Sequence, residues 1–163
     1  MPEELRSFRG PARVFESEEE CYAAYLGGSV PAGSAVVVRF EGPKGGPGMK
    51  ELHRITEIMR GIPGTAVVTD GRFSGASGGL SVGYLCPEAA EGGPIAAVRD
   101  GDTVSIDLVR GRIDLEVPAD EIAARLRAPS KRPAVPEDSL LGRYAAMVGS
   151  ARGGAVLNGK DRP

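Results

Sequence analysis

Two short runs of β-branched residues, each followed at once by a glycine-rich loop, constrain the fold of this chain most. The runs are Ala35–Phe40 and Thr65–Thr69, and continuous apolar stretches of this length are typical of strands buried on both faces. The glycine clusters that follow favour neither helix nor strand, because glycine loses the most backbone freedom on ordering. The sequence therefore predicts two buried strands that end in loops, where α/β folds usually place their sites.

Three loops of this kind carry the residues with chemical potential. The first loop is Glu41–Met49, the second is Thr69–Gly79 and the third is Cys86–Pro94. In the second loop Ser74 lies among glycines, two residues after Arg72, and positive potential favours the alkoxide form of a serine. A solvated Gly/Ser loop would explain the second loop taken alone, but the repeated pattern favours a functional site.

These segments resemble the C-terminal domain of the dihydroxy-acid dehydratase and 6-phosphogluconate dehydratase family. The motifs Glu41–Met49, Thr69–Gly75 and Pro87–Pro94 occur in the family's order and spacing, and the likeness runs from Gly10 to about Val156. The resemblance implies an α+β (mixed α/β) domain with a compact β/β/α barrel-like fold, similar to the swivelling domain of aconitase-type enzymes. We expect one domain over residues 1–156, truncated at its N-terminal edge, and a flexible tail over 157–163.

The resemblance implies a hydro-lyase that removes water from a 2,3-dihydroxy acid, a branched-chain amino-acid precursor, to give a 2-keto acid. One alternative is a sugar-acid dehydratase acting on 6-phosphogluconate or an aldonate, toward which Glu51–His53 and Gly75–Gly78 lean. Another is a free-standing, non-catalytic domain that binds small acids or a partner through its glycine-rich loops. A nucleotide-binding P-loop is excluded, because no Lys-Ser or Lys-Thr pair follows the glycines.

The family's motifs assign roles to individual residues. Ser74 matches the proposed base and Glu41 matches a magnesium ligand, while Lys44, Arg72 and Ser77 are candidates for touching substrate oxygens. Magnesium takes six oxygen ligands, so we expect its other protein ligands to lie outside this chain.

Three acidic residues of the second and third loops have structural explanations that are independent of the resemblance. We expect Asp70 to hold its own loop through an Asx-type hydrogen bond, and Glu88 and Glu91 to act as loop braces.

The family also carries an iron–sulfur cluster, whose cysteine ligands the resemblance assigns to an N-terminal domain absent from this chain. Cys21 and Cys86 are the only cysteines, and two thiols without close spacing form no metal site or disulfide framework. We expect both to be small packing residues. Cys86 stands where the family has serine or a small residue, and Tyr84 stands where many members have histidine.

Composition excludes several classes of partner. The net charge of −2 and the charged fraction of 26% indicate no nucleic-acid or membrane surface. No apolar run approaches the roughly 18 residues that cross a bilayer, and we expect a cytoplasmic protein. The resemblance further implies the N-terminal dehydratase domain as partner, a homodimer in the complete enzyme, and no activity in the isolated chain.

Periodicity and turn signals predict the remaining elements. Expected helices are Ser17–Gly27, Met49–Arg60, Pro118–Arg127 and Leu140–Val148. In the first helix we expect the glutamates after the cap to form a solvated face, and in the second we expect His53 to lie at the surface or in packing. Expected strands are Leu80–Tyr84, Ile95–Val98, and a hairpin of Thr103–Leu108 with Arg112–Val117. The proline-rich segment Ala128–Glu137 reads as a linker.

Overall fold

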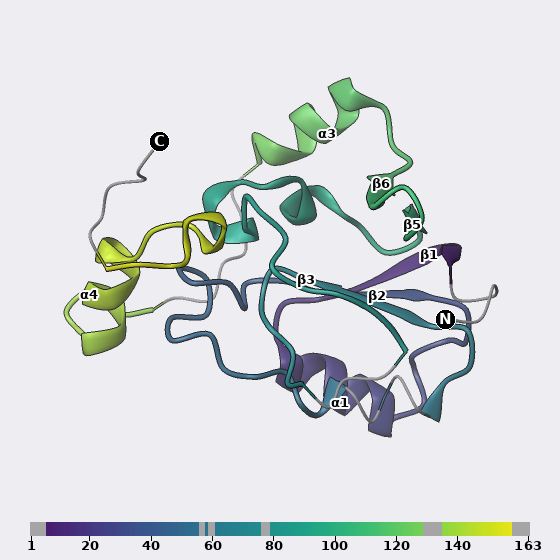
Figure 1. The fold of residues 1–163 in the computed structure, drawn as a ribbon, viewed down its shortest axis with the longest axis horizontal. Coiled ribbons are helices and arrows are strands. Elements are labelled where there is room, and N and C mark those ends of the chain that lie inside the picture. Colours follow the sequence, from purple (N-terminus) through teal and green to yellow (C-terminus); the bar gives the residue numbers. More distant parts are fainter. Residues whose placement is uncertain (1–5, 56–57, 59–60, 76–78, 129–134, 158–163) are drawn as a thin grey trace.

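A mixed sheet curled into a half-barrel forms the centre of the molecule (Figure 1). The computed structural model describes residues 6–55, 58, 61–75, 79–128 and 135–157. The strands are β1 (Ser7–Phe15), β2 (Ala35–Val38), β3 (Ala66–Thr69), β4 (Leu80–Val82), β5 (Thr103–Asp107) and β6 (Arg112–Leu115). The helices are α1 (Glu18–Leu26), α3 (Ala119–Leu126) and α4 (Leu140–Met147), with 3-10 turns η2 (Ala89–Glu91), η3 (Pro94–Ala97) and η4 (Ala151–Gly153).

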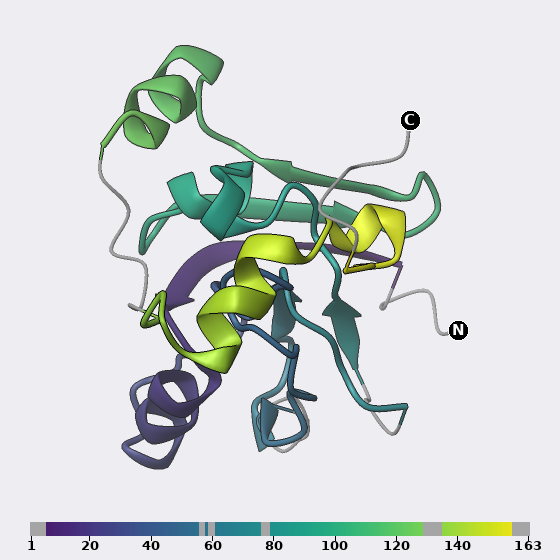
Figure 2. The same cartoon turned by 90° about the vertical axis from the view of Figure 1, so that its left-hand side faces the viewer.

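The sheet has the strand order β4-β3-β2-β1-β5-β6. β1 to β4 run parallel to one another, whereas β5 and β6 are antiparallel and form the predicted hairpin. Helix α1 lies on one side of the sheet, and the hairpin curls over the other side (Figure 1). Helix α4 lies beyond the ends of the parallel strands, where Figure 2 shows it in the foreground. This mixed, barrel-like arrangement confirms the predicted fold class.

Strand β1 lies in the middle of the sheet, although the sequence did not predict it as a strand. Gly10 and Pro11 interrupt its pattern, and proline is normally confined to strand edges or bulges because it has no N–H to donate. The structure accommodates both, because β1 changes partner at this point: Ser7–Pro11 pairs with β5, and Ala12–Phe15 pairs with β2. A Cβ at Gly10 would lie 2.3 Å from the carbonyl oxygen of Gly33, so only glycine fits.

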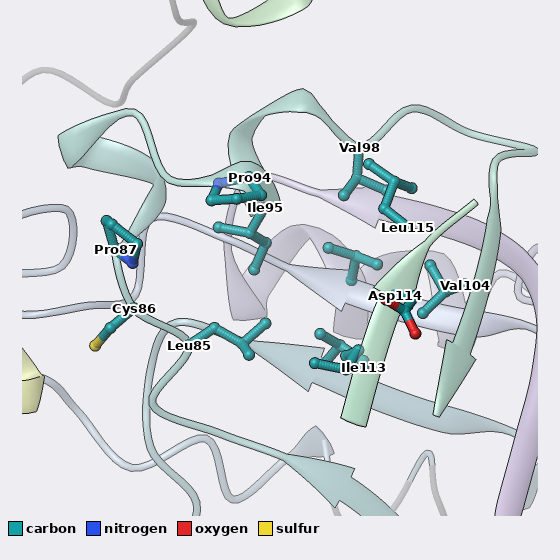
Figure 3. Close-up of a pocket in the computed structure, with 12 residues that line it drawn as sticks. Leu85, Cys86, Pro87, Pro94, Ile95, Val98, Val104, Ile113, Asp114 and Leu115 are labelled. Carbon is teal, nitrogen blue, oxygen red and sulfur yellow. The ribbon is translucent and has the colours of Figure 1, made fainter. Parts of the chain in front are cut away.

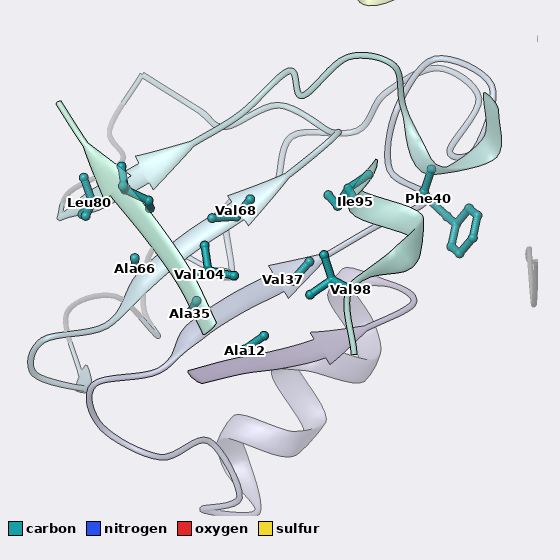
Figure 4. Packing of buried hydrophobic residues seen from close by; sticks show 12 residues of the cluster. Ala12, Ala35, Val37, Phe40, Ala66, Val68, Leu80, Ile95, Val98 and Val104 are labelled. Carbon is teal, nitrogen blue, oxygen red and sulfur yellow. The ribbon is translucent and has the colours of Figure 1, made fainter. Parts of the chain in front are cut away.

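The two predicted buried strands divide their side chains between two hydrophobic clusters. Val37 of β2 and Val68 of β3 point into the half-barrel, where Val104 of the hairpin crosses above them (Figure 4). Val36 and Val67 point to the other face and pack with Cys21 of α1 and with Ile55 and Ile58. Both faces are therefore buried, at about 1.5–3 kcal/mol for each fully buried aliphatic side chain.

The predicted strand Ile95–Val98 is wrong, because these residues belong largely to the 3-10 turn η3. Pro94 at its start has the backbone angle of a helical turn. The Arg39 guanidinium donates to the carbonyl oxygens of Ala96 at 2.8 Å and Val98 at 3.1 Å. Carbonyls that a strand would direct to a neighbouring strand are thus satisfied by a side chain.

The predicted helix from Met49 is wrong at its start. Glu51 forms a β-bridge with Arg72, and the Leu52 N–H donates to the Arg72 carbonyl oxygen at 2.9 Å. Of the described residues beyond this point, 55, 58 and 61 are helical. His53 is exposed, in agreement with a surface position.

Helix α1 begins as predicted, with the Ser17 hydroxyl accepting the Glu20 N–H at 3.2 Å. The predicted helices near the C-terminus are confirmed as α3 and α4. Most of the predicted linker, residues 129–134, and the tail from 158 onward lie outside the described residues. In the part of the chain that the structure describes, no helix is long and apolar enough to cross a membrane.

A partly buried ion pair attaches α3 to the rest of the domain. The Arg125 guanidinium donates to both carboxylate oxygens of Asp102, at 2.5 and 3.1 Å, and to the Ala97 carbonyl oxygen at 3.0 Å. Burial by itself would raise the pKa of Asp102, but the hydrogen bonds from Arg125 and the Arg99 N–H outweigh it and lower this pKa. The stabilisation is therefore present above the unfolded-state pKa and is lost as pH falls through the folded-state pKa.

We predict that Arg125→Met lowers the free energy of unfolding by about 1–3 kcal/mol, because it leaves the partly buried, charged Asp102 without its partner. Urea denaturation at neutral pH measures the loss. Arg112→Gln is the matched control, since Arg112 forms an ion pair with Asp114 at 2.6 Å but remains 68% exposed. Exposed pairs contribute about 0–1 kcal/mol, and equal losses in the two variants would contradict the prediction.

Candidate functional site

The three glycine-rich loops meet at one edge of the sheet. β2 and β3 pair in parallel with Val38 opposite Thr69, so the first and second loops leave the sheet side by side. The third loop follows β4, which pairs with β3 in parallel, and returns to both of the others through hydrogen bonds. The predicted site is therefore assembled from three chain segments.

Asp70 joins all three loops and is fully buried. Its Oδ1 accepts the Glu41 N–H at 3.0 Å, and its Oδ2 accepts the N–H groups of Phe40 at 3.2 Å and Ala89 at 2.9 Å. Burial raises the pKa of Asp70, against the opposing effect of these backbone hydrogen bonds. The expected Asx-type bond within the second loop is wrong, because Asp70 accepts N–H groups of other segments instead. The local turn is closed by Thr69, whose hydroxyl accepts the Gly71 N–H at 2.9 Å.

Glu88 braces the first loop from the third, as predicted. Its carboxylate is 2% exposed and accepts the backbone N–H groups of Lys44, at 3.0 and 3.1 Å, and Gly45, at 2.8 Å. Glu91 forms an ion pair with the Lys44 ammonium. The position of Lys44 is therefore set by two acidic residues of the third loop.

Glu41 is placed at the end of β2 with only 4% of its surface exposed. Its Oε1 accepts the Glu18 N–H at 2.8 Å and lies 3.4 Å from the Lys50 ammonium nitrogen. Burial raises the pKa of Glu41, while the Glu18 N–H and Lys50 act in the opposite direction. Phe40, just before it, has a φ of 64°, a left-handed conformation that costs about 1–3 kcal/mol for a residue other than glycine.

Close packing around Glu41 explains two glycines of the loops. A Cβ at Gly71 would lie 2.7 Å from the Glu41 Cβ, and a Cβ at Gly46 would lie 3.1 Å from Glu41 Oε2. The second loop and Gly46 of the first loop can therefore both pack closely against Glu41. By contrast, a Cβ at Gly75 would meet nothing within 4 Å.

Arg72 connects the second loop to the end of the first. Its Nε donates to the Met49 carbonyl oxygen at 2.6 Å, and its Nη1 donates to Glu51 Oε1 at 3.1 Å. These bonds give the guanidinium a structural role. Its contact with substrate stays a prediction. Ser74 follows in the same loop and is half-buried. Ser77 lies outside the described residues.

An apolar cavity of about 260 Å³ lies inside the half-barrel (Figure 3). Its walls include Val37 and Val68 of the sheet, Ile113 and Leu115 of the hairpin, and Cys86 at the start of the third loop. Glu41, Lys44, Arg72 and Ser74 do not line it. Cys86 is exposed, so the prediction that it is a packing residue is wrong, whereas Cys21 is buried as predicted.

Two residues of the site were missed by the sequence analysis. Glu18 was expected to lie on a solvated helix face, but it is 4% exposed and its Oε1 accepts the Arg54 N–H at 3.0 Å. Lys50 carries no motif, and it contacts Glu41 only because the first loop folds back toward α1. Neither position had a signal in the local sequence, since both depend on contacts between distant segments.

The site can supply one oxygen ligand and one hydroxyl to a bound molecule. Over the described ranges, no three His, Cys, Asp or Glu side chains come together in a way that could hold a metal ion. Glu41 has both of its side-chain contacts on Oε1, and no described residue donates a hydrogen bond to Oε2. A carboxylate oxygen held in this way fits a hard divalent cation as one ligand of several.

Comparison with known proteins places this chain among dehydratases. The family model described as dihydroxy-acid/6-phosphogluconate dehydratase C-terminal matches residues 1–155. The chain is 52% identical over 159 residues to the dihydroxy-acid dehydratase of Pyrococcus furiosus, covering 95% of this chain and 28% of that protein. It is 49% identical over 160 residues to the dihydroxy-acid dehydratase of Moorella thermoacetica, covering 96% of this chain and 29% of that protein. The chain thus spans less than a third of the length of these curated relatives.

We predict that Asp70→Asn destabilises the chain by about 2–3 kcal/mol. The amide keeps the shape of the side chain but has one acceptor oxygen in place of two, so buried N–H groups lose their partner. Urea denaturation measures the change. Asp100→Asn is the control: Asp100 also accepts a backbone N–H, from Val14 at 2.7 Å, but its side chain is 51% exposed. A loss no larger than that of Asp100→Asn would contradict the bracing role.

A second prediction compares two glycines of the same loop. Gly71→Ala should lower the free energy of unfolding by about 1–3 kcal/mol, because the new methyl group overlaps with Glu41. Gly75→Ala should change it by no more than about 0.5 kcal/mol, because the space around Gly75 is open. Thermal and urea unfolding of both variants provide the test, and equal effects would show that close approach to Glu41 is unimportant.

Proposed function

Because this chain belongs to the dihydroxy-acid/6-phosphogluconate dehydratase family, we propose that it acts as the C-terminal domain of a dihydroxy-acid dehydratase. The observation that carries the proposal is the 52% identity to the dihydroxy-acid dehydratase of Pyrococcus furiosus across nearly the whole chain. The relatives named above favour a 2,3-dihydroxy acid over a sugar acid as substrate.

The reaction removes a proton from C2 and hydroxide from C3 of the substrate, giving an enol that tautomerises to the 2-keto acid. It needs a base at C2 and positive charge near the substrate carboxylate, where negative charge develops. The three loops support this assignment because they place a serine, a lysine, an arginine and a glutamate at one edge of the sheet.

We assign the role of base to Ser74. A serine hydroxyl is a weak base at neutral pH, so the assignment requires strongly positive surroundings. Arg72 contributes a fixed charge two residues away, since its guanidinium is held by the Met49 carbonyl oxygen and Glu51. Lys44, held by Glu91, is the proposed contact for substrate oxygens, together with Arg72.

Glu41 is the proposed magnesium ligand of this chain, acting through Oε2. When bound, the cation would supply positive charge to the carboxylate oxygens of the substrate. Glu41 is one oxygen ligand of the six that magnesium takes, so the other protein ligands would come from a different part of the enzyme.

The cysteines of this chain do not fit an iron–sulfur cluster. Cys21 is buried beside the sheet and Cys86 is exposed at the rim of the apolar cavity. We therefore assign no cluster ligand to this chain. We further propose a cluster, an N-terminal dehydratase domain as partner and a homodimeric complete enzyme, for which the family assignment is the only support.

The proposal predicts that Ser74→Ala, in a complete dehydratase carrying this domain, lowers kcat by ~10²–10⁴-fold. Substrate affinity and iron content should change little, because the variant removes only the proton acceptor. Exchange of the C2 hydrogen with solvent should be lost in parallel.

Ser7→Ala, at an exposed serine at the start of β1, is the control and should leave kcat unchanged. Near-normal turnover by Ser74→Ala would show that Ser74 is not the base. Absence of dehydratase activity with dihydroxy acids in the unmodified complete enzyme would overturn the proposed function itself.

A further inference from the structure

Lys50, the residue directly after the first loop, lies among three carboxylates. Its ammonium nitrogen is 2.5 Å from Glu19 Oε1, 3.4 Å from Glu41 Oε1 and 3.9 Å from Glu18 Oε2. The side chains of Glu41 and Glu18 are 6% and 5% exposed, whereas Lys50 is 43% exposed. The Lys50 ammonium thus lies within 4 Å of two buried carboxylates and one exposed carboxylate.

The two oxygens of Glu41 have different surroundings. Oε1 is held by the Glu18 N–H, in the first turn of α1, and by Lys50. N–H groups in the first turn of a helix have no partner within the helix and are available as donors. No hydrogen bond to Oε2 is made by the residues that the structure describes.

Glu41 shares Lys50 with a second buried carboxylate. The Glu18 carboxylate accepts the Arg54 N–H at 3.0 Å and lies 3.9 Å from the Lys50 ammonium nitrogen. Two buried like charges repel one another, and an unpaired buried charge is strongly unfavourable. Lys50 lies within 4 Å of both carboxylates, so it offsets this repulsion, and its contact with Glu41 is made through Oε1.

We propose that Lys50 is a positioning residue for Glu41: together with the Glu18 N–H it holds Oε1, so that Oε2 is the oxygen presented to a ligand of the site. The geometric part of this inference stands on the contacts above. Its functional part rests on the proposed function, in which Glu41 binds a divalent cation.

Amide hydrogen exchange of the 163-residue chain tests the geometric part. If Lys50 keeps Glu41 in place, Lys50→Met should speed exchange of the Glu18 N–H by about tenfold, equivalent to roughly 1.4 kcal/mol of local opening. The Glu20 N–H, which donates to the Ser17 hydroxyl, is the internal reference and should be unaffected.

Two further variants separate positioning from general destabilisation. Lys50→Arg should restore slow exchange, because it keeps a cation at the position. Glu19→Gln removes the surface partner of Lys50 but leaves its contact with Glu41, so it should resemble the unmodified chain. Unchanged exchange of the Glu18 N–H in Lys50→Met, in a chain that remains folded, would overturn the proposal.

Binding of Mn²⁺ to a complete dehydratase carrying this domain, followed by electron paramagnetic resonance, tests the functional part. Positioning predicts about tenfold weaker binding in Lys50→Met and recovery in Lys50→Arg. Tighter binding in Lys50→Met would mean that Lys50 only repels cations and would overturn a positioning role. If Glu41→Gln leaves Mn²⁺ binding unchanged, the proposed metal role of Glu41 fails, and the exchange result still decides the geometric part.

Discussion

The site depends above all on one buried carboxylate, that of Asp70. Its three backbone hydrogen bonds, to Phe40, Glu41 and Ala89, tie the ends of two neighbouring strands to a third loop that follows β4. A buried carboxylate is unfavourable unless its oxygens are satisfied by donors. The three N–H groups meet that requirement only when all three loops are in place. The loops and Asp70 therefore stabilise one another, and the left-handed conformation of Phe40 can persist.

Other side chains also hold the main chain of these loops through hydrogen bonds. Glu88 accepts two N–H groups of the first loop, Thr69 closes the turn of the second loop, and Arg72 connects the two. Main-chain groups held by buried side chains move little, which is the preorganisation that a site for developing negative charge requires. The apolar cavity of the half-barrel shares the third loop with the site, through Cys86, Pro87 and Pro94, but Glu41, Lys44, Arg72 and Ser74 do not line it.

Much of this arrangement could be predicted from local pattern. Uninterrupted β-branched residues predicted β2 and β3, alternation predicted the β5–β6 hairpin, and Ser17 with its following glutamates predicted α1. Glu88 was expected to brace a loop and does so. For the strands, the hairpin and α1 the deciding interaction lies within a few residues or follows from a single strand being buried on both faces. Glu88 is different, because it accepts an N–H from Gly45, 43 residues away. The family resemblance, which rested on the loop motifs, is confirmed by the match over residues 1–155.

The sequence by itself determined the buried strands, the glycine-rich loops at their ends and the kinds of side chain that those loops carry. Only the tertiary structure decided that an interrupted segment, with Gly10 and Pro11, becomes the central strand, because a change of partner there removes the need for an N–H from proline. It also decided that Glu18 is buried and that Lys50 lies beside Glu41. Three of these contacts join segments more than twenty residues apart: Glu18 to Glu41, Arg54 to Glu18, and Lys50 to Glu18. Local periodicity carries no information about them, since their energy exists only once the sheet has brought the segments together.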